Sequence, residues 1–240
     1  MKAGENKGLA VEDLHVHYGE ICALRGVTFC AQRGASIAVV GRNGAGKSTL
    51  LKSLAGLISG MSGKVTWQGE PIRTQQKRSW IAYLPQREEI DWNFPITVGG
   101  LVDMGLYPRI GPWRRFTPDH RKDSAEAIRQ MGLEGLETRR IAELSGGQQQ
   151  RAFMARALAG KAEVFLLDEP FAGLDPEGSR NLAERIRELA RQGAIIISSH
   201  HDLDSIPETF EHTLLVKTRQ IAFGPSREIL SAERIREAFG

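Results

Sequence analysis

The chain has 240 residues, with 32 lysines and arginines against 29 aspartates and glutamates, a formal net charge of +3. This length fits one large domain or two small ones, and the composition is ordinary for a soluble globular protein. So small a charge gives no argument for a nucleic-acid partner, and the two cysteines, Cys22 and Cys30, fit no metal-binding spacing and are typical of a reducing compartment.

Short apolar runs rich in β-branched residues alternate with helical patterns, which predicts an α/β fold with a largely parallel sheet. Antiparallel, half-exposed strands are expected at residues 14–18, 27–29 and 65–68. Buried strands are expected at residues 36–40, 164–167, 194–198 and 213–216. Helices are expected at residues 180–191 and 49–57, the latter from the helical spacing of Leu50, Leu51, Leu54 and Leu57.

The middle of the chain, from about residue 87 to residue 160, lacks a convincing strand pattern and is expected to be an all-helical insert. Thr117 and Pro118 start a helix that runs to about Met131, and Ser145 can cap another that ends near Gly160.

Basic residues gather at residues 107–122, where only Asp119 faces Arg109, Arg114, Arg115, Arg121 and Lys122. Such a stretch is typical of a solvated surface, with anionic lipid headgroups or a partner protein as alternatives. Residues 1–8 are polar, unlike a signal peptide, and no apolar run approaches the roughly 20 residues that span a bilayer. A role at a membrane would require another chain to hold this one there.

A glycine-rich segment lies between the strand expected at residues 36–40 and the helix at 49–57. Glycines allow successive backbone N–H groups to point at phosphate oxygens, and the following helix adds the positive end of its dipole. Lys47 supplies a charge for the β- and γ-phosphates, and Ser48 a ligand for Mg²⁺. We expect a nucleotide phosphate site formed by Gly41, Arg42, Asn43, Gly44, Ala45, Gly46, Lys47, Ser48 and Thr49.

The strand expected at residues 164–167 ends in two acidic residues, Asp168 and Glu169. A carboxylate at the C-terminal edge of a strand can hold Mg²⁺, directly or through water, and this role is expected for Asp168. Glu169 can polarise the attacking water. Apolar strands often end in aspartate, so the pair becomes a strong signal only together with the phosphate site.

The segment Leu144-Ser145-Gly146-Gly147-Gln148 completes a set of motifs that resembles the ATP-binding subunit of an ABC transporter over nearly the whole chain. The resemblance implies a phosphate-loop NTPase fold with a mostly parallel core sheet, an antiparallel β subdomain and the helical insert. It implies a single domain, residues 1–240, with a RecA-like core plus β subdomain at about 8–86 and 161–240 and a helical subdomain at about 87–160. It also implies that Ser145, Gly146, Gly147 and Gln148 contact the γ-phosphate held by an opposite subunit.

The same resemblance gives roles to further residues. Gln86 matches the glutamine that links the Mg²⁺ site, with Ser48 and Asp168, to the helical insert. Asp175, in Gly173-Leu174-Asp175, matches a loop that crosses the dimer interface. Tyr18 matches the aromatic residue that stacks on adenine, although a tyrosine at a strand end can also serve packing.

Two adjacent histidines, His200 and His201, follow the strand expected at residues 194–198. Alignment of Asp202 and Leu203 with the family pattern places the catalytic switch at His201. A two-histidine metal site is the alternative, but adjacent residues on an extended segment point in opposite directions.

Residues 86–98 resemble the corresponding segment in ATPases of manganese, zinc and iron importers. The implied cofactors are ATP and Mg²⁺. The implied partners are a second copy of the chain, permease subunits at the cytoplasmic face of the inner membrane and, indirectly, an extracytoplasmic solute-binding protein. Trp92 and Phe94 would line a groove for a permease helix or belong to the core of the insert. Alternatives are import of another solute such as an iron chelate, a soluble ABC-type ATPase, or a regulatory module, which would require a damaged catalytic set.

Overall fold

The computed structural model describes residues 8–72, 78–111 and 115–239. Residues 1–7 of the polar N-terminal segment, and Arg114 of the basic stretch, lie outside the described residues. Within the described ranges, no helix is long and apolar enough to cross a lipid bilayer.

In the described part of the chain, ten strands form one sheet in the order β5-β4-β1-β2-β10-β9-β3-β8-β7-β6. One end is antiparallel and consists of β1 (Gly8–Tyr18), β2 (Ile21–Gln32), β4 (Met61–Trp67) and β5 (Glu70–Pro71). The other end is mostly parallel and consists of β3 (Ser36–Val40), β6 (Ile81–Leu84), β7 (Val164–Leu167), β8 (Ile195–Ser199), β9 (His212–Lys217) and the antiparallel β10 (Arg219–Pro225). The predicted α/β fold, with a parallel core and an antiparallel part, is confirmed.

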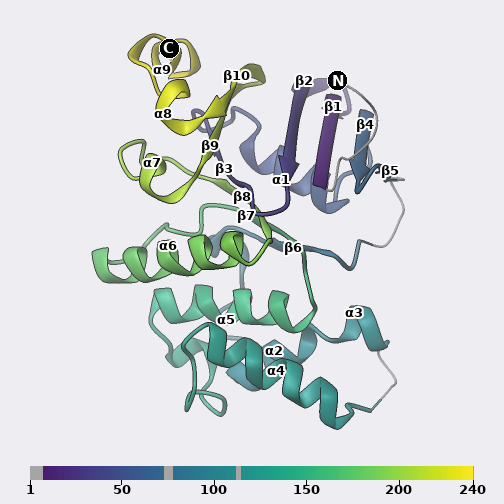
Figure 1. The fold of residues 1–240 in the computed structure, drawn as a ribbon, viewed down its shortest axis with the longest axis vertical. Helices are drawn as coiled ribbons and strands as arrows, with labels where there is room; N and C mark the ends of the chain where they lie inside the picture. Colours follow the sequence, from purple (N-terminus) through teal and green to yellow (C-terminus); the bar gives the residue numbers. More distant parts are fainter. Residues whose placement is uncertain (1–7, 73–77, 112–114, 240) are drawn as a thin grey trace.

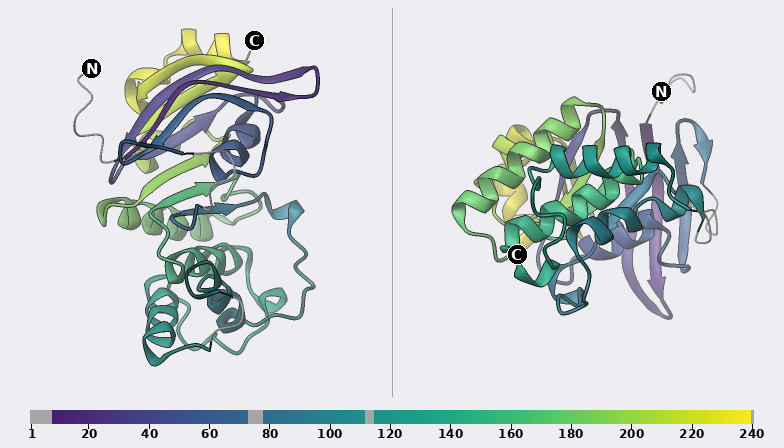
Figure 2. Two further views of the ribbon diagram at one scale, coloured as in Figure 1. Left: turned by 90° about the vertical axis from the view of Figure 1, so that its right-hand side faces the viewer. Right: turned by 90° about the horizontal axis from the view of Figure 1, so that it is seen from below.

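Helices occur in two regions (Figure 1). With the sheet lie α1 (Lys47–Ala55), α6 (Pro176–Arg191), α7 (Ile206–Thr209), α8 (Ser226–Ile229) and α9 (Ala232–Phe239). Between β6 and β7 come α2 (Val98–Met104), α3 (Tyr107–Ile110), α4 (Pro118–Gln130), α5 (Gly146–Ala159) and two 3-10 turns, Arg87–Glu89 and Ile141–Glu143. Figure 2 shows α2 to α5 gathered in a lobe beside the sheet body.

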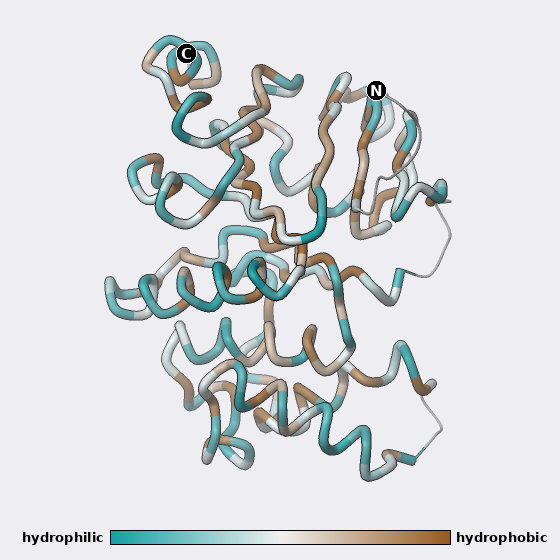
Figure 3. Tube along the Cα trace, viewed as in Figure 1, coloured by the Kyte–Doolittle hydropathy of each residue, from teal (hydrophilic) through white to brown (hydrophobic). Residues whose placement is uncertain are grey.

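Successive side chains on the central strands point to opposite faces of the sheet, so the core consists of two clusters, one on each face. Ile37 and Val39 of β3 belong to a cluster shared with α1 and the antiparallel strands, whereas Ala38 and Val40 belong to one shared with α6 and the insert. All four side chains are fully buried. Figure 3 shows the resulting pattern, with hydrophobic strands inside and hydrophilic stretches along the outer helices.

Some elements differ from the expectations. α1 ends at Ala55 because Gly56 adopts a left-handed conformation with φ of 79°, which stops the helix. Leu57 therefore lies beyond the helix with 63% of its surface exposed, and its expected place on the apolar helix face is wrong. The strands β5, β6 and β10 were not expected; β5 has only 2 residues and most of β10 is only half-buried.

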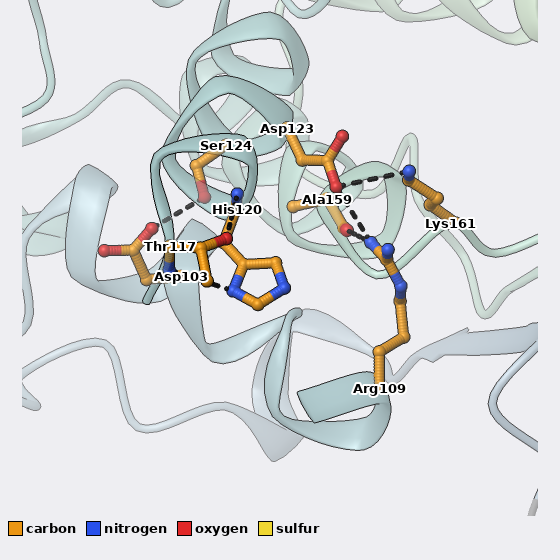
Figure 4. A network of polar contacts seen from close by, with 8 residues as sticks. All are labelled: Asp103, Arg109, Thr117, His120, Asp123, Ser124, Ala159 and Lys161. Atoms are coloured by element: carbon orange, nitrogen blue, oxygen red, sulfur yellow. Dashed lines mark hydrogen bonds and ion pairs between the residues drawn. The ribbon is translucent and has the colours of Figure 1, made fainter. Parts of the chain in front are cut away.

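A polar network connects the helices of the insert (Figure 4). Asp123 on α4 accepts a hydrogen bond from Arg109 on α3 at 3.0 Å and pairs with Lys161 at 3.3 Å. Arg109 also donates to the carbonyl of Ala159 at 3.3 Å. The expectation that only Asp119 faces the basic stretch is wrong, because Asp123 lies one helical turn further along α4.

The start of α4 follows the predicted capping pattern. The hydroxyl of Thr117 accepts from the backbone N–H of His120 at 3.3 Å, and Nδ1 of His120 accepts from the backbone N–H of Thr117 at 3.2 Å. Further along the helix, the hydroxyl of Ser124 donates to Asp103 on α2 at 2.6 Å. The capping bonds order the start of α4, and the bond from Ser124 ties the helix to α2.

Candidate functional site

The glycine-rich segment, here called the phosphate loop (residues 41–49), connects β3 to α1 in the predicted order. Gly44 and Gly46 have φ of 78° and 100°, a region that favours glycine. A β-carbon at Gly41 would stand 2.2 Å from the carbonyl oxygen of Val216, so only glycine lets the loop approach β9 so closely. The loop borders an open depression of about 480 Å³, here called the phosphate depression.

Lys47 lies in this depression with only 6% of its surface exposed. Its ammonium group donates to the carbonyl oxygens of Gly41 at 2.9 Å and Arg42 at 3.2 Å. Burial lowers the pKa of Lys47, while the nearby Glu169 and Asp168 carboxylates raise it. A buried cation held by neutral carbonyls, beside backbone N–H groups at a helix start, is the donor set that phosphate oxygens require.

Asp168 follows β7 and is 1% exposed. One carboxylate oxygen accepts from the hydroxyl of Ser199 at 2.7 Å, and the other accepts from the hydroxyl of Tyr83 at 3.3 Å. Burial, followed by the charge of Asp168, raises the pKa of Tyr83 and keeps its hydroxyl a donor. The acid is therefore held in a fixed orientation by two side chains.

Ser199 is a residue that the sequence-based reasoning missed. Its hydroxyl donates to Asp168 and accepts from the backbone N–H of Glu169 at 2.7 Å, so one side chain holds both the carboxylate of Asp168 and the backbone of Glu169. The sequence does show a serine pair at residues 198–199, but its meaning depends on the pairing of Ser198 with Leu167, the residue before Asp168, in the folded sheet.

Glu169 has φ of 49°, a conformation that is uncommon for residues other than glycine. Such backbone strain gathers at functional sites when surrounding contacts enforce it, and the hydrogen bond to Ser199 is one such contact. The turn places Glu169 on the lining of the phosphate depression with Lys47 and Ser48.

Gln86 also lines the phosphate depression, and its amide nitrogen donates to the hydroxyl of Ser48 at 3.3 Å. The oxygen donors of Ser48, Gln86 and Asp168 are hard ligands of the kind that Mg²⁺ accepts. The structure thus brings Lys47, Ser48, Gln86 and Glu169 around one depression, with Asp168 packed behind them.

The signature turn (residues 145–148) lies at the start of α5 and does not line the phosphate depression. The hydroxyl of Ser145 accepts from the backbone N–H of Gln148 at 3.3 Å, and the side-chain oxygen of Gln148 accepts from the N–H of Ser145 at 3.0 Å. Asp175 at the end of the interface loop (residues 173–175) caps α6, because its carboxylate accepts from the N–H of Gly178 at 3.0 Å.

The two histidines differ sharply. His200 is 4% exposed, bonds through Nε2 to the hydroxyl of Ser205 at 2.8 Å, and packs edge-on against Phe171. His201 is exposed, and both line a separate depression of about 380 Å³ beside α6. Tyr18 ends β1 with 48% of its surface exposed. The structure therefore places neither His201 nor Tyr18 on the lining of the phosphate depression.

Acid should destabilise the protein through His200. Burial, followed by the charge of His201, lowers the pKa of His200 to about 4, and Asp202 opposes this shift. In the unfolded chain the pKa of this histidine is near 6.5, so the unfolded state binds more protons than the folded state below that pH. The contribution of His200 to the free energy of unfolding is therefore fully present above pH of about 6.5 and is lost as the pH falls towards about 4. The loss at pH of about 4.5 is on the order of 2–3 kcal/mol.

Urea unfolding at pH of about 6.5 and at pH of about 4.5 measures this loss in the free energy of unfolding. His200→Gln should reduce the difference in stability between the two pH values. The matched variant His201→Gln, at an exposed site, should retain most of it, because burial is the main cause of the shift. An unchanged difference in His200→Gln would assign the acid sensitivity to other groups.

Comparison with known proteins identifies the family. A family model described as "ABC transporter" matches residues 24–172. The chain is 41% identical over 231 residues to a "Probable metal transport system ATP-binding protein" of Chlamydia trachomatis, which covers 96% of this chain and 88% of that protein. It is 39% identical over 232 residues to the "Manganese transport system ATP-binding protein MntB" of Listeria monocytogenes, covering 97% of this chain and 96% of the relative.

A solved structure gives the same result. The structure of cbiO1 from Clostridium perfringens, part of the ABC transporter complex cbiONQ, matches with a TM-score of 0.82 at 29% identity, covering 97% of this chain and 94% of that one. The phosphate loop, the two acids after β7 and the signature turn thus occur together in a chain that aligns with such proteins almost from end to end. The chain belongs to the ABC transporter family and is one of its ATP-binding, ATP-hydrolysing proteins.

Proposed function

We propose that this protein is the ATPase subunit of an importer for a transition metal, manganese, zinc or iron, and that it acts as a pair beside a separate permease at the cytoplasmic face of the inner membrane. The observation that carries the proposal is the likeness to a relative named for manganese transport, which extends over 97% of this chain rather than the ATPase motifs alone. Residues 86–98, which resemble the metal-importer segment, connect β6 to α2, where the sheet body joins the insert.

A pair of subunits is required because one copy carries two separated halves of the site. The phosphate depression contains Lys47 and Glu169, whereas the signature turn starts α5 elsewhere on the surface. A second copy that places its signature turn over this depression would add the positive end of a helix dipole on the open side of the phosphates. Asp175 would then lie at the interface between the two copies.

The residues divide the chemistry as follows. Lys47 and the N–H groups of the phosphate loop hold the phosphates. Ser48, Gln86 and Asp168 would hold Mg²⁺, which would supply positive charge against the phosphates. Glu169 orients a water whose oxygen bonds to the γ-phosphorus while the bond to the β-phosphate oxygen breaks.

Two exposed residues complete the proposed site. Tyr18, at the end of β1, stacks on adenine, and its half-exposed ring leaves a face for the base. His201 contacts the γ-phosphate in the closed pair, which requires the segment after β8 to approach the phosphate depression. The structure supports the choice of His201 over His200, because His200 is buried and already bonded to Ser205.

Phe94, rather than Trp92, is the residue that contacts the permease in the proposed complex. Trp92 packs edge-on against Phe153 at 5.6 Å and donates from Nε1 to the carbonyl of Arg87 at 2.8 Å, so it is part of the insert. Phe94 has 56% of its surface exposed, and Met104 at the end of α2 has 39%. Exposed aromatic residues are favoured anchors for a partner helix.

Nucleotide binding should depend on Lys47. MgATP at about 100 times its dissociation constant adds roughly 2.7 kcal/mol of stability. For a chain of this size the melting temperature should rise by about 5–10 °C. Lys47→Ala should lose most of this rise in a thermal-shift assay, and an equal rise in the variant would place the nucleotide elsewhere.

Hydrolysis should depend on Glu169 and His201. Glu169→Gln keeps the shape of the side chain but not the carboxylate, so it should bind ATP, stop turning it over and accumulate as a dimer in light scattering. His201→Ala should lower ATPase activity far more than His200→Ala does at pH 7.5. A monomeric Glu169→Gln variant with normal turnover would remove Glu169 from the mechanism, and the reverse order of the histidine effects would move the switch by one residue.

The proposed transport is tested in a deletion strain by measuring cellular manganese, zinc and iron after growth in metal-poor medium. At least one metal should fall and return with the wild-type chain. Phe94→Ala should restore uptake poorly while the isolated subunit keeps its basal ATPase activity, and the matched surface variant Leu57→Ala should restore it fully.

Unchanged levels of all three metals, with failure to take up an iron chelate or another solute, would overturn the metal assignment. A chain that never co-purifies with a membrane permease would favour the alternative of a soluble ATPase outside transport.

A further inference from the structure

The side chain of Arg87 lies where three segments of the described chain meet. Its Nη2 donates to the side-chain oxygen of Gln149 on α5 at 3.1 Å, and its guanidinium carbon lies 5.5 Å from the ring centre of Trp92. A β-carbon at Gly146 would stand 2.8 Å from Nη1 of Arg87, and one at Gly173 would stand 3.3 Å from the same atom. Arg87 therefore touches the signature turn and the interface loop at once.

The backbone of Arg87 is tied to the phosphate depression. Gln86, the preceding residue, donates to the hydroxyl of Ser48 at 3.3 Å, and the carbonyl of Arg87 accepts from Nε1 of Trp92 at 2.8 Å. Any rearrangement of Gln86 around a bound phosphate thus acts directly on the residue that contacts the start of α5.

The acceptor of Arg87 is also firmly held. Gln149 is 4% exposed, and its amide nitrogen donates to the carbonyl of Ile141 at 3.0 Å. A hydrogen bond from a charged donor to a buried acceptor contributes more than an exposed ion pair does, because water competes for it less. The contact between Arg87 and Gln149 is therefore able to fix the position of α5.

The signature turn and the start of α6 approach each other closely beneath Arg87. A β-carbon at Gly147 would stand 3.4 Å from the α-carbon of Gly178, in the first turn of α6. A β-carbon at Gly146 would stand 3.2 Å from the side chain of Leu174 in the interface loop. The two segments are packed at glycines. Nη1 of Arg87 lies against Gly146 and Gly173, and Nη1 of Arg151 would stand 3.8 Å from a β-carbon at Gly147.

We propose that Arg87 is a positioning residue that fixes the signature turn and the interface loop of its own protomer in the arrangement that reaches the ATP of the partner protomer. A planar guanidinium suits this task because it donates to Gln149 while its positive charge lies over the ring of Trp92, a combination that an ammonium group provides less well. The inference rests on the proposed ATP-dependent pair and adds the residue that ties Gln86 to the surface offered to the partner.

Loss of Arg87 should weaken closure of the pair but not capture of ATP by one protomer, whereas a general loss of structure would weaken both. Arg87 does not line the phosphate depression, so capture of ATP by a single protomer should not need it. Closure of the pair should need it. In a Glu169→Gln background, Arg87→Met should leave the dissociation constant of a fluorescent ATP analogue, measured in dilute protein, within about twofold, and weaken ATP-driven dimerisation about tenfold or more, as expected for loss of a charge-assisted hydrogen bond.

Three further variants test whether the contact between Arg87 and Gln149 causes the loss of dimerisation. Gln149→Met should weaken dimerisation similarly, and the double variant should be no worse than either single one, because both remove the same contact. Arg87→Lys keeps the charge without the planar group and should recover only part of the dimerisation. Arg129→Met, which removes an arginine from an exposed ion pair on α4, should leave both measurements unchanged.

Sedimentation equilibrium with ATP, together with analogue titration, gives both quantities. Equal dimerisation of Arg87→Met and its parent would overturn the proposal, and so would a loss of ATP capture as large as the loss of dimerisation. If Arg87→Met fails to fold, Gln149→Met and Arg87→Lys give the same decision. If the Glu169→Gln parent stays monomeric with ATP, the proposed pair of subunits fails first, and this inference fails with it.

Discussion

Parallel pairing of β3, β8 and β7 is the constraint on which the site depends, because it brings the carboxyl ends of three strands to one edge of the sheet. The phosphate loop leaves β3, Asp168 and Glu169 leave β7, and the two histidines leave β8. Register then sets the finer geometry. Leu167 pairs with Ser198, so the next residue on each strand, Asp168 and Ser199, lie close enough for a 2.7 Å hydrogen bond.

The same edge carries buried charges whose cost has to be offset. Removing an ion from water costs several kcal/mol unless polar groups replace the water. Lys47 is held by two carbonyl oxygens and Asp168 by two hydroxyl groups, and no ion pair within the described residues includes either of them. Neutral partners orient a charge without cancelling its field.

Local signals in the sequence were enough to predict the fold and the position of the phosphate loop. These signals depend only on neighbouring residues, so they can be recognised in the sequence without knowledge of the fold. They are the β-branched runs, the glycines before Lys47, and the capping residues Thr117 and Ser145. Ser199 and Tyr83 could not be predicted in this way, because their contact with Asp168 exists only once β6, β7 and β8 are paired. The helix face that wrongly included Leu57 has a related cause, since Gly56 ends α1 through its own backbone conformation rather than through the apolar pattern.

The capping box at the start of α5 explains how the signature turn, half of the proposed shared site, can stay ordered in a single chain. Ser145 and Gln148 satisfy each other's backbone N–H groups, so the signature turn is held by its own residues. Gly146 and Gly147 between them carry no side chain that would cover their N–H groups. In the proposed pair, the entropy of ordering this turn would already be lost when the single chain folds, and the γ-phosphate of the partner would meet a preformed anion site. Closure would then depend less on making the turn than on where each protomer places it, which is why the contacts beneath α5 matter as much as the signature residues themselves.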